Sequence, residues 1–442
     1  MEQSSIAVES SCGQTQLERQ DTMANGDLKA YLGLLSGFFN EYRTVLRQKS
    51  QPPPRLALNY NRAFLVLLGL YPNRWLLGKY SHYKRCNRLL LANSTSLLLP
   101  IIFAMHESTN VVDMGEDMAW IIGISLIVTK NLYVCWRANQ IDELIEDFNY
   151  YERCFRPTQS RQLAELESDN VEIRRWQRLC YLVETTMNFA LIVFMVIFNV
   201  AICVQPLFSE RDLPYHAVFP FGWHNSVEHP RAHMLIYIWQ ALTSQFNLLA
   251  ICQIDTLGIH NFLHTALNLK ILCLEMHKLG KLQLTDLQFH AEFRRIIQFH
   301  QHLISTVQKN NGLFHGTFIA QMIASFALIS MSTFEAMAAA GDPKMAAKFL
   351  IFMFVTFVQL SYWCLAGTLV HTQSTDVAQA AFELKDWHTR SVFIQRNILF
   401  MIKRSQKPLL YAAKPFPPFT LATYSIILQQ CYRILALLRE AM

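Results

Sequence analysis

The sequence predicts an all-α membrane protein with seven transmembrane helices, a cytosolic N-terminus, an extracellular C-terminus and a cytosolic helical anchor region. Two observations predict this fold. Of the 442 residues, 52% are hydrophobic and only 16% are charged, whereas soluble domains carry about 25% charged residues. The apolar residues also gather in runs of about 20, which is the length that crosses the hydrocarbon core of a bilayer as a helix.

The apolar runs divide the chain into four regions. Residues 1–83 are expected to form a cytosolic N-terminal segment with amphipathic helices, and residues 84–371 a six-span bundle with cytosolic extensions. Residues 372–416 are expected to hold a cytosolic anchor helix and a proline breaker, "KPFPPF", because proline denies a helix its backbone donors. Residues 417–442 contain the last span. The seven expected spans are residues 86–105, 117–136, 179–205, 232–259, 313–339, 346–371 and 417–438.

The charges of the loops fix the expected orientation. The first loop, "HESTNVVDMGED", has no lysine or arginine, whereas the second and fourth loops are rich in both. Cytosolic loops of membrane proteins carry an excess of these residues. The alternation therefore predicts an N-terminus inside the cell, which is the opposite of the arrangement in G-protein-coupled receptors.

Several function classes are not favoured by the sequence. It has no nucleophile elbow, phosphate-binding glycine loop, HExxH motif or carboxylate cluster, so we expect neither an enzyme nor a cofactor. The net charge of +6 comes from alternate loops, which does not indicate a nucleic-acid partner. Inverted repeats, which many transporters show, are not evident. The ten cysteines form no CxxC pair and are expected to be free thiols.

Three ionisable residues occur in or beside the fourth span. Asp255 lies toward its inner end, and an acid at that depth is expected to be partnered or functional. We interpret Asp255 as buried at a contact between subunits. His260 and His264 are four residues apart, so one metal ion could bridge them. The neighbouring sequence offers no third ligand, and we therefore predict no metal site.

The last span combines apolar residues with Gln429, Gln430 and Arg433. Such polar groups are expected to face packed protein or water, because hydrocarbon penalises them. A hydrogen bond between helices and an aqueous pore are both consistent with glutamine in a span. With 3.6 residues per turn, one stripe of this helix consists of Thr423, Ile427, Gln430, Cys431 and Ile434.

Four stretches resemble the insect odorant receptor family: "LVLLGLYP" at 65–72, "LPYHAVFPF" at 213–221, "SYWCLAGTLVHTQSTDVAQAAFELKDW" at 361–387, and "FMIKRSQKPLLYAAKPFPPFTLATYS" at 400–425. The resemblance implies an odorant-gated, non-selective cation channel that passes monovalent and divalent cations. It further implies a small volatile organic ligand, contact with membrane lipid, and a heterotetramer with a co-receptor subunit in the plasma membrane of sensory neurons. The fourth loop lacks the long insertion of the co-receptor, so we interpret the chain as an odorant-tuning subunit.

Two other classes stay open at this point. Gustatory receptors share the "TY" and a following glutamine, but usually end in Gln-Phe, where this chain has "QQC". A gustatory-type chemoreceptor channel is therefore one alternative. A non-channel seven-helix receptor or transporter is the other.

The resemblance also assigns roles to residues of this sequence. Ile427 and Cys431 match the constricting positions of the family's pore helix, and Gln430 matches the polar one. The family's ligand pocket lies in the outer half of the bundle, where Asn199 or Tyr237 would supply an orienting hydrogen bond. Packing against the core or lipid is the alternative for each pocket residue. The candidate pocket residues are Trp120, Met195, Phe198, Asn199, Met234, Tyr237, Ile238, Phe352 and Phe357, and the candidate subunit-anchor residues are Asp376, Phe382 and Trp387.

Overall fold

The computed structural model describes residues 83–160, 167–204, 213–339 and 343–441. A few further residues are described singly, namely Arg43, Arg47, Asn61, Phe64, Leu65, Leu68, Leu70, Leu163 and Gly341. The amphipathic helices expected within residues 1–83 therefore lie almost wholly outside the described residues.

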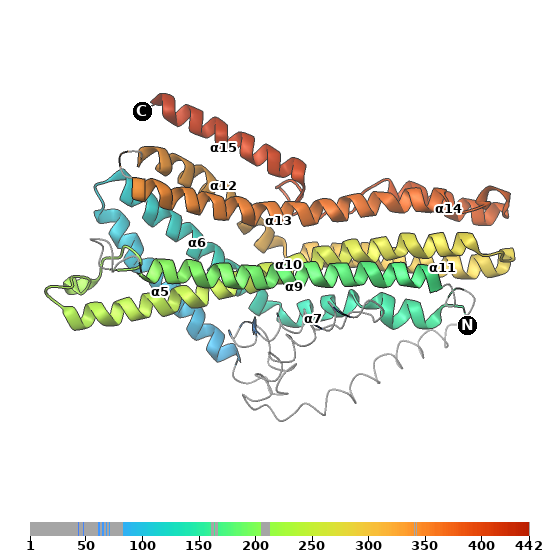
Figure 1. Cartoon of the computed structure of the whole chain (residues 1–442), viewed down its shortest axis with the longest axis horizontal. Helices are drawn as coiled ribbons and strands as arrows, with labels where there is room; N and C mark the ends of the chain where they lie inside the picture. Colours follow the sequence, from blue (N-terminus) through green and yellow to red (C-terminus); the bar gives the residue numbers. More distant parts are fainter. Residues whose placement is uncertain are drawn as a thin grey trace.

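The described chain is all-helical and forms an elongated bundle (Figure 1). Its long helices are α5 (Tyr83–Glu107), α6 (Val111–Trp136), α9 (Glu167–Val204), α10 (Pro230–Lys281), α11 (Asp286–Leu313), α12 (His315–Ala338), α13 (Pro343–Phe382) and α15 (Leu421–Ala441), and its shorter ones are α7 (Ala138–Asp147) and α14 (Val392–Ser405). Six of the described helices are long and apolar enough to cross a membrane: α5, α6, α9, α10, α12 and α13. Helix α15 carries the two glutamines and the arginine that lower its apolar content.

Three of the spanning helices are much longer than the apolar runs that predict them. Helix α10 has 52 residues, about 78 Å at 1.5 Å per residue, which is more than twice the thickness of a hydrocarbon core of about 30 Å. Helix α9 begins at Glu167 and α13 ends at Phe382. Helix α10 packs against α11, and α13 packs against α14, at the end of the bundle on the right in Figure 1. The helices therefore continue past the expected membrane region, because their amphipathic turns find packing partners there.

An aromatic cluster ties the irregular segment before α15 to the bundle. Tyr411 is buried and stacks on Phe262 of α10, with ring centroids 3.9 Å apart. Its hydroxyl is hydrogen-bonded to the Thr265 hydroxyl at 2.6 Å. The Phe419 ring lies 5.6 Å from Trp363 of α13. Because Phe419 is two residues before the start of α15, this cluster fixes the beginning of that helix.

The packing of Phe419 against α13 also requires a glycine at position 367. A Cβ atom at this position would overlap the carbonyl group of Phe419. The close approach of a backbone is one of the few situations that only glycine permits. The "CLAG" stretch therefore sets where the last helix docks on α13.

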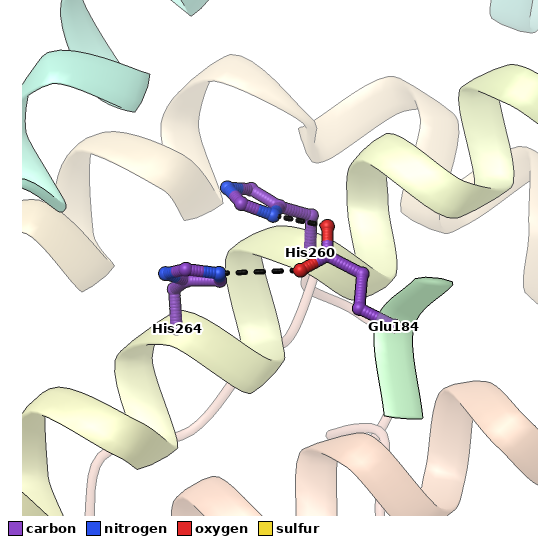
Figure 2. A group of neighbouring side chains, drawn as sticks. All are labelled: Glu184, His260 and His264. Atoms are coloured by element: carbon purple, nitrogen blue, oxygen red, sulfur yellow. Dashed lines mark hydrogen bonds and ion pairs between the residues drawn. The ribbon is translucent and has the colours of Figure 1, made fainter. Parts of the chain in front are cut away.

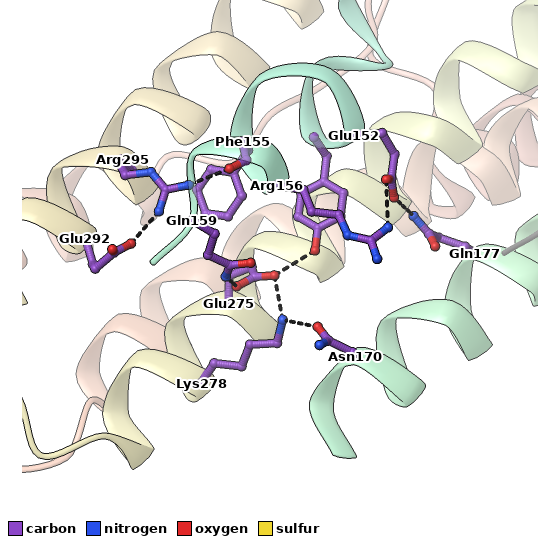
Figure 3. A network of polar contacts seen from close by, with 11 residues as sticks. Glu152, Phe155, Arg156, Gln159, Asn170, Gln177, Glu275, Lys278, Glu292 and Arg295 are labelled. Atoms are coloured by element: carbon purple, nitrogen blue, oxygen red, sulfur yellow. Dashed lines mark hydrogen bonds and ion pairs between the residues drawn. The ribbon is translucent and has the colours of Figure 1, made fainter. Parts of the chain in front are cut away.

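A polar network holds the second loop against the extensions of α9 and α10 (Figure 3). Buried Glu275 of α10 accepts hydrogen bonds from the Tyr151 hydroxyl at 2.7 Å, Gln159 Nε2 at 2.6 Å and Lys278 Nζ at 2.8 Å. Lys278 also donates to Asn170 of α9 at 2.8 Å. Burial raises the pKa of Tyr151 well above its usual value, so its hydroxyl stays protonated and remains a donor.

Candidate functional site

Trp120 lies at the centre of a buried aromatic cluster in the half of the bundle predicted to be outer. Its ring meets Tyr215 edge-on with centroids 4.6 Å apart, and meets Phe352 of α13 in the same way at 4.8 Å. Leu97 and Ile101 of α5 complete the apolar surroundings. Edge-to-face aromatic groups offer a small apolar molecule large contact surfaces with little conformational cost.

An ion pair and a contact between a carboxylate and a histidine border this cluster. The Glu116 carboxylate, one turn before Trp120, lies 2.5 Å from Lys348 Nζ of α13. Asp117 is fully buried and pairs with His216 Nδ1 at 2.9 Å. These groups give an otherwise apolar region a small number of fixed polar contacts, which is typical of ligand sites.

The loop between α9 and α10 covers the cluster. The backbone N–H of Tyr215 donates to the Gln240 side chain at 3.0 Å, and the N–H of Val218 donates to the Pro100 carbonyl at 3.0 Å. Pro100 lies inside α5. The loop is therefore hydrogen-bonded to α5 and α10 and places Tyr215 directly on Trp120.

The structure places the other sequence-predicted pocket residues in different surroundings. Buried Asn199 is hydrogen-bonded to Ser244 and Gln245 of α10, each at 2.5 Å. The Tyr237 hydroxyl donates to the Cys203 carbonyl. Half-buried Met195 lies on α9, half-buried Phe357 packs against the main core, and Met234 and Ile238 are 64% and 44% exposed. The Phe198 side chain lies outside the described residues.

Trp120 and Phe352 are thus the two predicted pocket residues that the structure brings into direct contact. Tyr215, Glu116 and Lys348 adjoin them but were missed by reasoning from the sequence. Tyr215 lies within "LPYHAVFPF", one of the stretches that resemble the receptor family, so the sequence offered a reason to consider it. The other two could not be found, because no spacing along the chain relates position 116 to position 348.

The interpretation of Asp255 as a subunit contact is wrong, because its partner belongs to the same chain. Asp255 Oδ1 lies 2.5 Å from Lys130 Nζ of α6, and both side chains are at most 2% exposed. Its other oxygen accepts from Gln359 at 2.6 Å and from the Tyr362 hydroxyl at 2.8 Å. Lys130 also donates to Gln321 of α12. The network joins four helices through buried charges.

Helix α15 packs against α12 and α13 with one face and leaves the other exposed. Thr423 and Cys431 are buried, and the Cys431 sulfur accepts a hydrogen bond from Ser330 of α12 at 3.4 Å. Ile427 and Ile434 are half-buried, and Gln430 is exposed. Of the expected stripe, Thr423 and Cys431 therefore face the chain's own bundle. Their small side chains let α12 approach.

Of the predicted anchor residues, Asp376 and Phe382 lie in the last two turns of α13, and Trp387 follows that helix. Asp376 accepts a hydrogen bond from Gln373 at 3.0 Å. The Trp387 indole donates to the Phe382 carbonyl at 3.0 Å, and the Phe382 ring is 60% exposed. Nearby α14 exposes further large apolar side chains, which are Val392, Phe393, Leu399 and Phe400. An apolar surface of this kind marks a contact with another protein or a membrane.

Comparisons with known proteins agree with this architecture. The sequence matches the family described as 7tm Odorant receptor over residues 110–432. It is 49% identical to Odorant receptor 47b of Drosophila melanogaster over 422 residues, which cover 95% of this chain and 100% of that protein. It is 33% identical to Putative odorant receptor 65c of the same species over 356 residues, covering 80% of this chain and 85% of the relative.

The fold is similar to that of the insect olfactory receptor OR5 from Machilis hrabei. The TM-score is 0.72 at 14% sequence identity, and the match covers 87% of this chain and 98% of that one. A structure of the same receptor in complex with eugenol matches with a TM-score of 0.70. The family match and the identity to receptor 47b decide against the gustatory alternative. The chain is a multi-pass membrane protein and not an enzyme, and it belongs to the insect odorant receptor family.

Proposed function

We propose that the chain is the odorant-tuning subunit of a ligand-gated, non-selective cation channel in the plasma membrane of sensory neurons. Four subunits, among them a co-receptor, surround a pore lined by α15 of each. The observation that carries this proposal is the position of α15 at the edge of the spanning helices, with one face packed and an exposed face on which Gln430 lies among apolar side chains. The Gln430 side chain is exposed on the single chain, and a pore would hydrate its amide.

The pore is proposed to run along the border between the packed and exposed faces of α15. Half-buried Ile427 and exposed Gln430 lie one turn apart on this border. In a ring of four subunits they would form an apolar constriction beside a ring of amides. Such constrictions gate by dewetting, and amides replace part of the hydration shell of an ion. Amides carry no net charge, so this ring would discriminate little among cations.

The ligand site is proposed to be the cluster around Trp120. The comparison structure with eugenol supports a small aromatic or apolar molecule as the ligand class. Tyr215, which closes the cluster from the loop, and Phe352 would contact the ligand together with Trp120. The Glu116–Lys348 pair at the border would supply polar contacts to a ligand oxygen.

Helix α6 and the side chains packed on Lys130 lead from this site to the start of the pore helix. Lys130 lies ten residues after Trp120 on α6, about 15 Å further along the helix axis. Its ammonium lies 5.5 Å from the ring of Trp363, which in turn contacts Phe419 at the start of α15. A ligand that prefers the open arrangement would shift the population of states through these contacts.

Truncation of Trp120 tests the ligand site. We expect Trp120→Ala to raise the half-maximal concentration of an activating volatile about ten- to a hundredfold, because burying an aromatic side chain is worth about 1.5–3 kcal/mol and 1.4 kcal/mol is tenfold in affinity. The measurement is whole-cell current in cells that express the chain with the co-receptor, under a panel of volatiles.

Met234→Ala is the matched control for this measurement, because Met234 is a pocket residue by resemblance but is 64% exposed in the structure. Its dose–response curve is expected to stay within about twofold of the wild type, as surface substitutions have small effects. Equal shifts in both variants would place the ligand elsewhere. No current from the wild-type chain with the co-receptor, despite surface expression, would favour a non-channel receptor.

A further inference from the structure

Glu184, His260 and His264 come together where α9 crosses α10 (Figure 2). His260 Nδ1 lies 2.5 Å from one oxygen of the Glu184 carboxylate, and His264 Nε2 lies 3.3 Å from the other. The two imidazole rings are tilted by 35° to each other, with centroids 3.9 Å apart. The carboxylate thus faces both histidines from the neighbouring helix.

The geometry is close to that of a three-ligand metal site. One atom from each residue lies within 4.8 Å of the other two. Zinc binds imidazole nitrogen and carboxylate oxygen at about 2.0–2.2 Å, so two ligands of a tetrahedral ion are about 3.4 Å apart. An ion would take the place of the proton that lies between His260 and Glu184. Small rotations of the side chains would open the shortest contact to the required separation.

The charge and the donor types also fit a zinc ion. Two neutral imidazoles and one carboxylate are a known zinc ligand set, and the carboxylate supplies a full negative charge where neighbouring side chains are largely buried. A water molecule would fill the fourth position.

The cluster has an access route. Glu184 and His260 are at most 5% exposed, whereas His264 is 29% exposed. His260 follows Pro230, the first residue of α10, by 30 residues, which is about 45 Å of helix. That distance exceeds a hydrocarbon thickness of about 30 Å, so the cluster lies at the predicted cytosolic end of the spans. An ion would enter from that side past His264.

We propose that Glu184, His260 and His264 bind one Zn²⁺ ion that ties α9 to α10 at the predicted cytosolic end of the spanning bundle. The bound ion links two helices that otherwise meet there through side chains alone. It thereby stabilises the folded chain and resists sliding of α9 along α10. The proposal does not depend on the channel function, because metal binding is measured without a current.

The test uses the full-length chain, purified in detergent or in lipid nanodiscs. The protein is incubated with ZnCl₂, exchanged into metal-free buffer, and its zinc content is measured by mass spectrometry. We expect about one zinc ion per wild-type chain and a higher melting temperature with zinc than with EDTA. Both effects are expected to disappear in His264→Ala, a change at the most exposed of the three ligands.

Two further variants make the result decisive. Glu184→Gln keeps the shape of the side chain and removes its charge, and is expected to lower zinc retention at least tenfold. His290→Ala removes a histidine of α11 that lies beside Phe393, outside the cluster, and is expected to leave retention unchanged. Wild-type protein that retains no more zinc than His264→Ala would overturn the proposal and leave the three residues as a hydrogen-bonded cluster. The proposal would also be overturned if His290→Ala lost as much zinc as His264→Ala.

Discussion

Replacing Lys130 by methionine is expected to destabilise the receptor by about 3–5 kcal/mol, the usual cost of leaving a buried charge without its partner. Asp255 would keep its hydrogen bonds from Gln359 and Tyr362 but lose its counter-ion. Because the pair joins α6 to α10, surface expression and the melting temperature of the purified protein should both fall. Fluorescence-detected size-exclusion chromatography after heating measures the change.

A second substitution separates loss of the charge pair from loss of packing. In Lys130→Met with Asp255→Asn, the charge is removed from both sides and the amide still accepts hydrogen bonds from Tyr362. The double variant should therefore be more stable than Lys130→Met alone. Lys309→Met is the control, since its pair with Asp147 is partly exposed to solvent and is worth at most about 1 kcal/mol. A double variant no better than the single one would contradict the assigned pairing.

Replacing Tyr411 by alanine is expected to cost about 3–5 kcal/mol, the usual range for truncating a large aromatic side chain in a core. The change removes the stacking on Phe262 and leaves the Thr265 hydroxyl without this partner. Since Tyr411 holds the segment that leads into α15, we also expect altered gating in protein that reaches the surface. A raised current without ligand, recorded from whole cells, would show this.

Tyr411→Phe is the conservative variant at the same position. It keeps the ring and removes the hydroxyl, so the cost should fall to about 1–3 kcal/mol, the range for a buried polar group left unpaired. The ligand-free current should then remain close to that of the wild type. If Tyr411→Ala expresses, melts and gates like the wild type, the segment before α15 does not depend on this contact.

The sequence predicts the spans well because their signal is local. Apolar runs of about 20 residues mark α5, α6, α12 and α13, and prolines mark the irregular segment before α15. The lengths of α9, α10 and α13 are not predicted, since nothing local stops a helix whose amphipathic faces find partners outside the membrane. The contacts of α10 with α9 and α11, and of α13 with α14, explain those additional turns.

The candidate sites are predicted less completely because they depend on contacts between distant parts of the chain. Helix geometry correctly aligns His260 with His264, but Glu184 is 76 residues away and its approach follows from the crossing of α9 and α10. The same limit applies to Lys130 and Asp255, which are 125 residues apart. For α15, periodicity puts Cys431 and Ile427 on one stripe and does not show which neighbour covers it.

The central claim is that α15 lines a cation pore along the border of its packed face, and one measurement tests it most directly. Reversal potentials of odorant-evoked currents are compared between the wild type, Gln430→Glu and Gln429→Glu, each expressed with the co-receptor, in sodium and then in calcium solution. Both glutamines are exposed and adjacent, so they form a matched pair. We expect Gln430→Glu to raise the permeability of calcium relative to sodium several-fold, because carboxylates in a pore attract divalent cations. Gln429→Glu should match the wild type. An unchanged reversal potential in Gln430→Glu, or an equal shift in Gln429→Glu, would contradict the proposed pore.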